Sequence, residues 1–220
     1  MYEILIILFF GALAIINLRA RDDEFVNVTS KINDKMPKLW EIVHQSIKEN
    51  RFLKAEKALL TILKIDQKNV AAYNRLGILY AKQKEYKDAI DCFEIASSLD
   101  DSATTLHNLG LIYYETENYE KATLAFEQAL KLENNLATRH VAYAKVQEKL
   151  GNIKLAVAEL KEAIQLEPTK ESYSLLYKTY LENDMIEEAT ELKKKFKRYL
   201  SKKATRTIPH KIRRPRRAVI

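Results

Sequence analysis

The sequence predicts an all-α fold, arranged as a solenoid of stacked helix pairs. The 220-residue chain has only four Gly and four Pro, and no stretch alternates polar and apolar residues as a β-strand does. A motif also recurs after 33 residues, and a fixed period of this length is typical of helical repeats that bury their apolar faces against their neighbours. The two clearest copies consist of Leu76, Gly77, Tyr80, Ala89, Phe93 and Ala96, and of Leu109, Gly110, Tyr113, Ala122, Phe126 and Ala129.

An apolar segment precedes the repeats. Residues 4–18 read ILIILFFGALAIINL and carry no charge. A helix of this length spans about 22 Å, and the neighbouring Met1 and Tyr2, together with snorkelling of Arg19, bring it closer to the roughly 30 Å of a bilayer core. We therefore predict a single transmembrane helix with its flanks at residues 1–21 and a polar juxtamembrane linker at residues 22–35.

Two alternatives to an uncleaved anchor stay open. A cleavable signal peptide favours a basic residue before the apolar run and a small-x-small site after it. This chain has Glu3 before the run and Leu18-Arg19-Ala20 after it, which is a poor cleavage site. A buried core helix would need cover on every face, because no polar residue alternates with the apolar ones. The anchor is the favoured interpretation.

The charges beside the apolar segment predict its orientation. Arg19 and Arg21 follow the segment, and no Lys or Arg precedes it. Basic residues next to a membrane helix favour the cytoplasmic side. We expect a single-pass protein of the inner (cytoplasmic) membrane with its repeats facing the cytoplasm. The short N-terminal flank fused directly to repeats also resembles bacterial inner-membrane proteins.

Five repeats are predicted over residues 36–200, at 36–69, 70–102, 103–136, 137–169 and 170–200. Small residues such as Gly77 allow two helices to approach closely, and large ones such as Phe93 fill the space opposite. Pro168 stands where the second helix of the fourth repeat should end, since Pro cannot continue the hydrogen-bond ladder. The terminal repeats keep less of the pattern: the first lacks the Gly, and the fifth has Tyr177 at the position of a small residue.

In spacing and residue types these repeats resemble the tetratricopeptide repeat over about three quarters of the chain. The resemblance implies a right-handed superhelical solenoid of about five helix pairs. It also implies a concave groove, lined mainly by the first helix of each pair, that binds a protein or peptide partner. An ordinary helical bundle is the alternative, but a bundle has no reason to repeat Gly and Phe at a fixed spacing.

Carrying the groove positions of these repeats onto this chain nominates thirteen residues for partner binding. Their mixture of apolar and polar side chains suits an extended peptide or a partner helix. The alternative for any one of them is a solvated inner face. Some members of the family clamp a C-terminal carboxylate with Lys and Asn, but the corresponding residues here do not match. The predicted groove residues are Trp40, His44, Asn74, Ile78, Lys82, His107, Leu111, Tyr114, Val141, Lys145, Glu148, Ser174 and Lys178.

No catalytic residue, cofactor or metal site is predicted, and an enzyme is not expected. The four His residues are scattered without a His-x-x-x-His pair, and no Gly-rich phosphate loop exists. The single Cys92 excludes an internal disulfide and a multi-cysteine zinc site. Its register beside Phe93 predicts a small, buried, hydrophobic residue.

The C-terminal end of the chain is strongly basic. Thirteen basic residues and no acid lie between Lys193 and Arg217, and the rest of the chain, with 24 basic and 30 acidic residues, has a net charge of −6. Residues 201–220 contain two Pro and few bulky apolar residues, so we predict a basic disordered tail. Its predicted contact residues are Lys202, Lys203, Arg206, Lys211, Arg213, Arg214, Arg216 and Arg217.

Three targets compete for this tail: anionic lipid headgroups, RNA, or no fixed partner. The function predicted from the sequence is a non-catalytic, membrane-anchored scaffold or adaptor that holds a protein or peptide in the groove of its repeats. The alternative is an RNA- or ribosome-associated adaptor that uses the basic tail.

Overall fold

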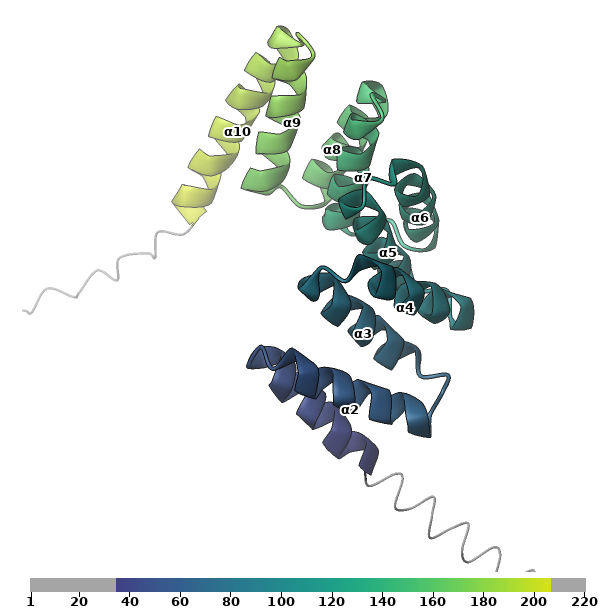
Figure 1. Ribbon diagram of the computed structural model, residues 1–220. Coiled ribbons are helices and arrows are strands. Elements are labelled where there is room, and N and C mark those ends of the chain that lie inside the picture. The colour runs from purple at the N-terminus through teal and green to yellow at the C-terminus, as the bar shows by residue number, and fades with distance from the viewer. Residues whose placement is uncertain (1–34, 207–220) are drawn as a thin grey trace, which may run out of the picture. The chain divides into compact units, whose positions relative to one another are not determined.

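The computed structural model describes residues 35–206, and every element in this range is helical (Figure 1). The predicted anchor, nearly all of the predicted linker and residues 207–220 of the predicted tail lie outside the described residues. A helix over residues 35–48 comes first. It is followed by α2 (Phe52–Ile65), α3 (Val70–Gln83), α4 (Tyr86–Leu99), α5 (Ala103–Glu115), α6 (Tyr119–Leu132), α7 (Ala137–Lys149), α8 (Ile153–Leu166), α9 (Lys170–Glu182) and α10 (Ile186–Arg206).

Helices α3, α5, α7 and α9 begin at the residues where the sequence places the starts of the last four repeats. Short turns join the two helices of each pair, and one residue in each turn has a left-handed backbone. That residue is Gly151 in the fourth pair, with φ +76°, and Asn50, Lys84, Glu117 and Asp184 in the others. The chain therefore reverses direction by the same backbone device in all five pairs, although only one turn uses Gly, which adopts this conformation without a steric cost.

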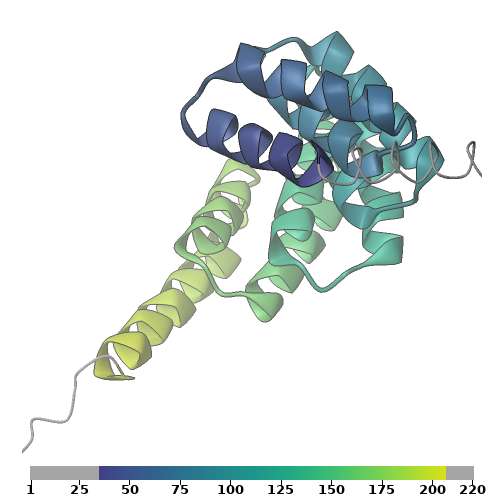
Figure 2. The ribbon, with the colours of Figure 1, turned by 90° about the horizontal axis from the view of Figure 1, so that it is seen from below.

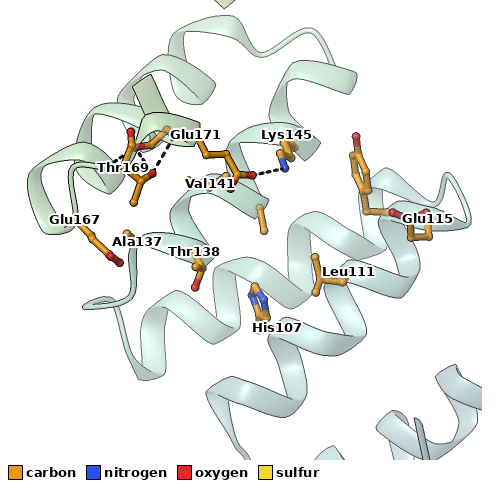
Figure 3. Close-up of a pocket in the computed structure, with 13 residues that line it drawn as sticks. His107, Leu111, Glu115, Ala137, Thr138, Val141, Lys145, Glu167, Thr169 and Glu171 are labelled. Atoms are coloured by element: carbon orange, nitrogen blue, oxygen red, sulfur yellow. Dashed lines mark hydrogen bonds and ion pairs between the residues drawn. The ribbon is translucent and has the colours of Figure 1, made fainter. Parts of the chain in front are cut away.

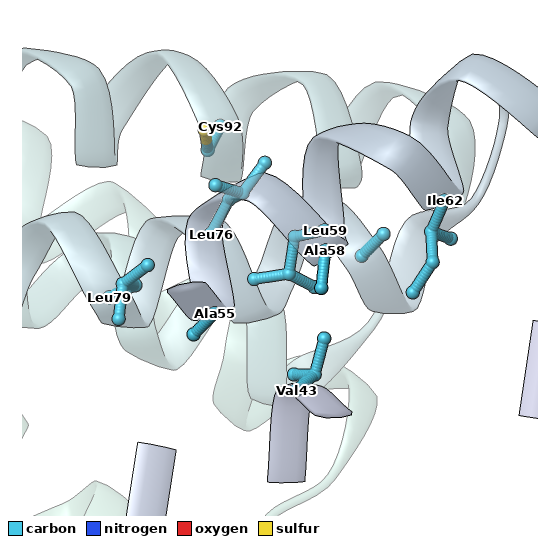
Figure 4. Close-up of a cluster of buried hydrophobic side chains, with 9 residues drawn as sticks. Val43, Ala55, Ala58, Leu59, Ile62, Leu76, Leu79 and Cys92 are labelled. Carbon is cyan, nitrogen blue, oxygen red and sulfur yellow. The ribbon is translucent and has the colours of Figure 1, made fainter. Parts of the chain in front are cut away.

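The described residues form two compact units, one ending at Asp101 and one starting at Ser102. The core of the first unit gathers buried residues from the helix over 35–48 and from α2, α3 and α4 (Figure 4). Cys92 belongs to this core, as the sequence predicts, and is a free thiol. Burial, helped by the charges of Asp88 and Asp91, raises the pKa of the Cys92 thiol to about 11, so it stays protonated and unreactive near neutral pH.

The second unit consists of the pairs α5–α6, α7–α8 and α9–α10. The second helix of one pair packs on the first helix of the next, since α6 contacts α7 and α8 contacts α9. The first helices α5 and α7 also contact each other. Figures 1 and 2 show α10 running back along α9 and continuing beyond it. First helices that lie side by side are what a shared binding surface requires.

The motif that repeats in the sequence is a direct contact between the two helices of a pair. A Cβ built on Gly77 would lie 2.8 Å from Cε1 of Phe93, and one built on Gly110 would lie 2.9 Å from Cζ of Phe126. Both rings are buried, with exposed fractions of 1% and 0%. Gly is therefore required here for close approach and not for backbone freedom, because no other residue leaves room for the ring.

Helix α10 differs from the prediction for the tail. The sequence predicts disorder from residue 201, whereas the helix continues to Arg206. Lys202, Lys203 and Ala204 are strong helix formers, and cations are favourable in the last turn of a helix because they complement its dipole. The prediction of disorder for residues 201–206 was therefore wrong, and it stays a prediction for residues 207–220.

The fourth pair suggests a test of the Gly–Phe contact, because Ala144 and Leu160 occupy the corresponding positions there and both are fully buried. Gly110→Ala should destabilise the protein by about 1 kcal/mol, since overpacking outweighs the better helix propensity of Ala. Phe126→Leu alone should cost about 1 kcal/mol through the space it leaves. The double variant, which recreates the fourth pair, should be destabilised by less than the sum of the two.

Urea denaturation followed by far-UV circular dichroism measures all three variants, and the double-mutant cycle isolates the pairwise term. Additive losses would show that the ring and the Gly do not constrain each other.

Candidate functional site

The clearest cavity in the second unit lies across three consecutive first helices (Figure 3). It has a volume of about 270 Å³ and draws its walls from α5, from α7 and from the turn that enters α9. On α5 and α7 the lining residues recur every three or four positions, so one face of each of these helices is presented to the cavity. Its lining consists of His107, Leu111, Tyr114, Glu115, Ala137, Thr138, Val141, Ala142, Lys145, Glu167, Thr169, Glu171 and Ser172. We call this cavity the groove.

The groove brings together five of the residues predicted from the sequence, namely His107, Leu111, Tyr114, Val141 and Lys145. A second, shallower cavity of about 520 Å³ between α7 and α9 contains two more, Ser174 and Lys178. The two cavities share Lys145 and Glu171, so they adjoin on α7 and at the start of α9. Seven predicted residues of the second unit therefore line one continuous strip of first-helix surface.

Glu148 is the remaining predicted residue in this unit, and it lies outside both cavities. Its carboxylate accepts a short hydrogen bond from the hydroxyl of Thr179, which is fully buried on α9. This bond ties α7 to α9. The side chain therefore has a structural partner within the array and helps to fix the spacing of two helices that line the groove.

The other five predicted residues belong to the first unit. Trp40 packs partly against the core of that unit, and its ring centroid lies 6.2 Å from that of the exposed His44. Asn74, Ile78 and Lys82 follow one another at intervals of four on α3, from half-buried to exposed. They share one face of α3 because residues four apart lie above one another on a helix.

The sequence missed the residues at the α8–α9 end of the groove. Glu167 and Thr169 precede α9, and Glu171 and Ser172 lie in its first turn. Thr169 caps this helix: its hydroxyl accepts a hydrogen bond from the Ser172 backbone N–H at 3.1 Å. A Thr-x-x-Ser spacing next to Pro168 is a recognisable helix start, and that signal would have placed these residues beside the first-helix surface.

Opposite charges are set along the groove. Glu115, Glu167 and Glu171 line it together with one cation, Lys145. Lys145 Nζ lies 3.6 Å from Glu171 Oε1, with the two side chains 40% and 75% exposed. An ion pair this exposed contributes about 0–1 kcal/mol. Because this ion pair is weak, Lys145 and Glu171 can each leave it and pair with a charged group on a bound partner.

His107 forms part of the groove floor as a neutral ring. Its Nδ1 is buried without a hydrogen-bond partner, and the ring meets Phe126 edge-on at a centroid distance of 5.5 Å. Burial, with a further contribution from the guanidinium of Arg139, lowers the pKa of His107 to about 4. Near neutral pH the floor therefore presents an uncharged imidazole beside the apolar Leu111 and Val141.

Buried polar contacts hold α7 in place beneath the groove. Arg139, only 2% exposed, donates from Nη1 to the backbone oxygen of Glu133 at 2.8 Å and from Nη2 to its carboxylate at 2.6 Å. His140 lies 2.7 Å from Glu159 Oε2 on α8 and 2.8 Å from the backbone oxygen of Asn134. These contacts fix the first turn of α7, from which Ala137, Thr138 and Val141 enter the groove.

Of the predicted tail residues, Lys202, Lys203 and Arg206 belong to the last turns of α10, and the other five lie outside the described residues. Between residues 35 and 206, no helix has both the length and the apolar character needed to span a bilayer. The same range contains no cluster of three or more His, Cys, Asp or Glu side chains that would hold a metal ion.

Comparison with known families decides what the repeats are. Tetratricopeptide-repeat patterns match residues 69–134 and residues 137–170. The chain carries tetratricopeptide repeats. These two segments contain α3 to α8, and therefore two of the three first helices that shape the groove.

Solved structures with the same fold support these repeats. The crystal structure of MamA superposes with a TM-score of 0.70 at 22% identity, covering 80% of this chain and 97% of MamA. MamA 41-end from Desulfovibrio magneticus RS-1 gives a TM-score of 0.70 at 14% identity, over 80% of this chain and 98% of that one. YrrB, described as a TPR protein with an unusual peptide-binding site, gives 0.60 at 20% identity, over 68% and 78% of the two chains. At these identities the likeness shows the fold alone. No curated protein matches the sequence of this chain.

The lowered pKa of His107 predicts a pH dependence of stability. The unfolded His has a pKa near 6.5 and the folded one about 4, so the unfolded chain takes up this proton first as the pH falls. The contribution of His107 to the free energy of unfolding should therefore decrease as the pH is lowered from about 6.5 to about 4. Above pH 6.5 this contribution should stay constant. His107→Gln should remove that part of the slope.

Urea denaturation at several pH values measures the slope, and Leu124→Gln, at an exposed position without a titrating group, is the control that should leave it unchanged. An NMR titration in which His107 changes charge near pH 6.5 would contradict the prediction.

Proposed function

We propose that this protein is a non-catalytic scaffold that holds an extended segment of another protein in the groove formed by α5, α7 and α9. The observation that carries the proposal is the shared strip of surface, in which three consecutive first helices contribute side chains to adjoining cavities. A strip built from several elements suits a long ligand with several weak contacts rather than a small substrate enclosed on all sides.

The chemistry of the strip fits such a segment. Leu111, 38% exposed, and Val141 offer apolar contact, while Tyr114 and Lys145 offer hydrogen-bonding groups at the same surface. Within the described residues, the neutral His107 has no hydrogen-bonded acid or nucleophile beside it, so it lacks the partners that acid–base or nucleophilic catalysis needs. The peptide-binding site attributed to YrrB supports the same use of the fold in a structurally similar protein.

The proposal includes a membrane anchor at residues 1–21, with the repeats facing the cytoplasm. Its support is the uncharged run at residues 4–18 and the two Arg residues that follow it. An anchored scaffold gathers its partner at the membrane surface and raises the effective concentration of anything that is bound there already.

The basic C-terminal end supports a contact with anionic lipid. Lys197 and Arg198 are exposed on α10, and neither forms an ion pair with another described residue. Each contributes about 1 kcal/mol near an anionic membrane. The second candidate function is an RNA- or ribosome-associated adaptor, which the same unpaired charges favour through counterion release.

Peptide selection tests the groove. A displayed library of random peptides is panned on the full-length protein in detergent micelles, and enriched peptides are measured by fluorescence anisotropy. Leu111→Glu should weaken their binding by about tenfold or more, because it places a charge where an apolar contact is made.

Leu124→Glu is the matched control, since Leu124 is 59% exposed on α6 and lies outside the groove; it should leave the affinity unchanged. Enriched peptides that bind Leu111→Glu as well as they bind the unaltered protein would overturn the groove as the binding site.

Cell fractionation tests the anchor. The full-length protein should sediment with membranes and keep Met1 and Tyr2, and protease added to intact spheroplasts should leave the repeats uncut. Deletion of residues 1–21 should release the protein into the soluble fraction. An N-terminus trimmed near Ala20, or repeats digested from outside, would show that the orientation is wrong.

A further inference from the structure

The last helix pair, α9–α10, departs from the pattern of the three preceding pairs at the three positions that bring two helices together. The small residue of the first helix is replaced by Tyr177, the large residue of the second helix by Lys193, and the following small residue by Phe196. The corresponding residues of the three preceding pairs are Gly77, Phe93 and Ala96; Gly110, Phe126 and Ala129; and Ala144, Leu160 and Ala163.

This exchange leaves a cavity between the two helices. In the preceding pairs Phe93, Phe126 and Leu160 are buried, whereas Lys193 at their position is exposed and does not fill the space beside Tyr177. A pocket of about 250 Å³ lies there. Its apolar lining comes from Tyr173, Tyr177, Leu192 and Phe196, and Lys170, Ser174 and Lys193 complete it.

The aromatic rings of this pocket are packed on one another. The centroids of Tyr173 and Phe196 lie 4.7 Å apart, and those of Tyr173 and Tyr199 lie 6.1 Å apart with nearly parallel planes. Tyr173, Tyr177 and Phe196 are only half-buried. The lining is therefore a preformed apolar surface that still gains free energy when a further side chain covers it.

Positive charge surrounds the opening. Lys170 and Lys193 line the pocket, and Lys194, Lys195 and Lys197 follow on α10; none of the five has an ion-pair partner within residues 35–206. The acidic residues of α10 lie in its first two turns, the last of them at position 191. A partner that fills the pocket therefore meets cations without an ion-pair partner, of which Lys195 shares a neighbouring cavity with Glu188 and Glu191.

We propose that the α9–α10 pocket is a second protein-binding site, which takes an acidic segment and buries one of its bulky apolar side chains at the place that Phe93 and Phe126 fill in their own pairs. Complementary charge would bring the segment to the pocket, and the inserted side chain would give the contact its specificity. This site shares no lining residue with the groove, although it adjoins the cavity between α7 and α9, with which it shares Lys170 and Ser174.

The shape of the pocket favours a protein segment over the other anionic partners. A bilayer surface cannot insert a single side chain between two helices. An RNA base would need an open ring face to stack on, and Tyr173, Phe196 and Tyr199 already present their faces to one another. An acidic polypeptide meets both requirements, because it carries the charge and the apolar side chain on one chain.

The test uses the full-length protein in detergent micelles and a fluorescent peptide of sequence Glu-Asp-Glu-Phe-Glu-Asp-Glu, followed by anisotropy. Saturable binding is expected, and replacement of the peptide's Phe by Ser should weaken it by about tenfold. The double variant Tyr177→Gly/Lys193→Phe restores two of the three positions, the Gly and the Phe of the second and third pairs. It should keep the helix content of the unaltered protein. Its affinity for the peptide should fall by about tenfold as well, because the Phe introduced at position 193 fills the pocket.

Lys197→Phe is the matched control, since it removes the same charge and adds the same ring outside the pocket; it should keep most of the affinity. If the double variant does not fold, Lys170→Glu/Lys193→Glu changes two exposed side chains only and should weaken binding of the acidic peptide. Leu111→Glu in the groove should have no effect.

Equal binding of the Phe and Ser peptides would show that only charge is recognised and would overturn the proposal. A single-stranded RNA of equal charge, or vesicles rich in anionic lipid, that displace the peptide and depend on Tyr177 and Lys193 would overturn it as well, in favour of that partner.

Discussion

The close contact between Gly and Phe within a helix pair is the constraint on which the rest of the second and third repeats depends. Because Gly77 and Gly110 leave no side chain in the way, Phe93 and Phe126 lie flat against the backbone of the neighbouring helix and are almost completely buried. The first helix is then fixed in its rotation about its own axis. On α5 this rotation leaves His107, Leu111 and Tyr114 on the face that enters the groove, so the packing that closes the pair also fixes which side chains line the groove.

Helix α7 has Ala144 and Leu160 in place of the Gly–Phe pair, and polar contacts add to their packing. Arg139 and His140 bind the preceding turn and α8, Tyr143 donates to Glu127 of α6 at 2.7 Å, and Gln147 donates to Thr123 of α6 at 3.1 Å. Burial and the adjacent Glu127 carboxylate raise the pKa of Tyr143, so it remains a hydrogen-bond donor. These four residues point into the protein, and the opposite face of the same helix supplies Val141 and Lys145 to the groove. Buried hydrogen bonds are directional, and α7 is therefore held at one rotation without a large interlocking ring.

The repeat period predicts much of this structure because packing against neighbours is periodic in the sequence. The starts of α3, α5, α7 and α9, the buried Cys92 and five of the groove residues follow from a register counted in repeats; the five are His107, Leu111, Tyr114, Val141 and Lys145. The register does not predict the contacts of connecting turns, nor the hydrogen bonds between particular side chains. Glu167 and Thr169 reach the groove from a connecting turn, and Glu148 is bound to Thr179 although its position alone suggests a free groove residue. The repeat period shows which face of a helix a residue lies on. It does not show whether the side chain of that residue already has a hydrogen-bond partner in a neighbouring helix.

The unusual last pair explains the length and charge of α10. Without a buried Phe at position 193, α10 is held to α9 mainly by Ala189, Leu192 and the rings that meet Tyr173. Its 21 residues exceed the 13 of α9, so its last turns have no first helix to pack on. Helix formation there must rest on the intrinsic propensity of residues such as Lys and Leu and on the favourable interaction of cations with the C-terminal end of the helix dipole. Basic residues meet both needs. The same residues give the surface beside the α9–α10 pocket cations that form no ion pair with another described residue.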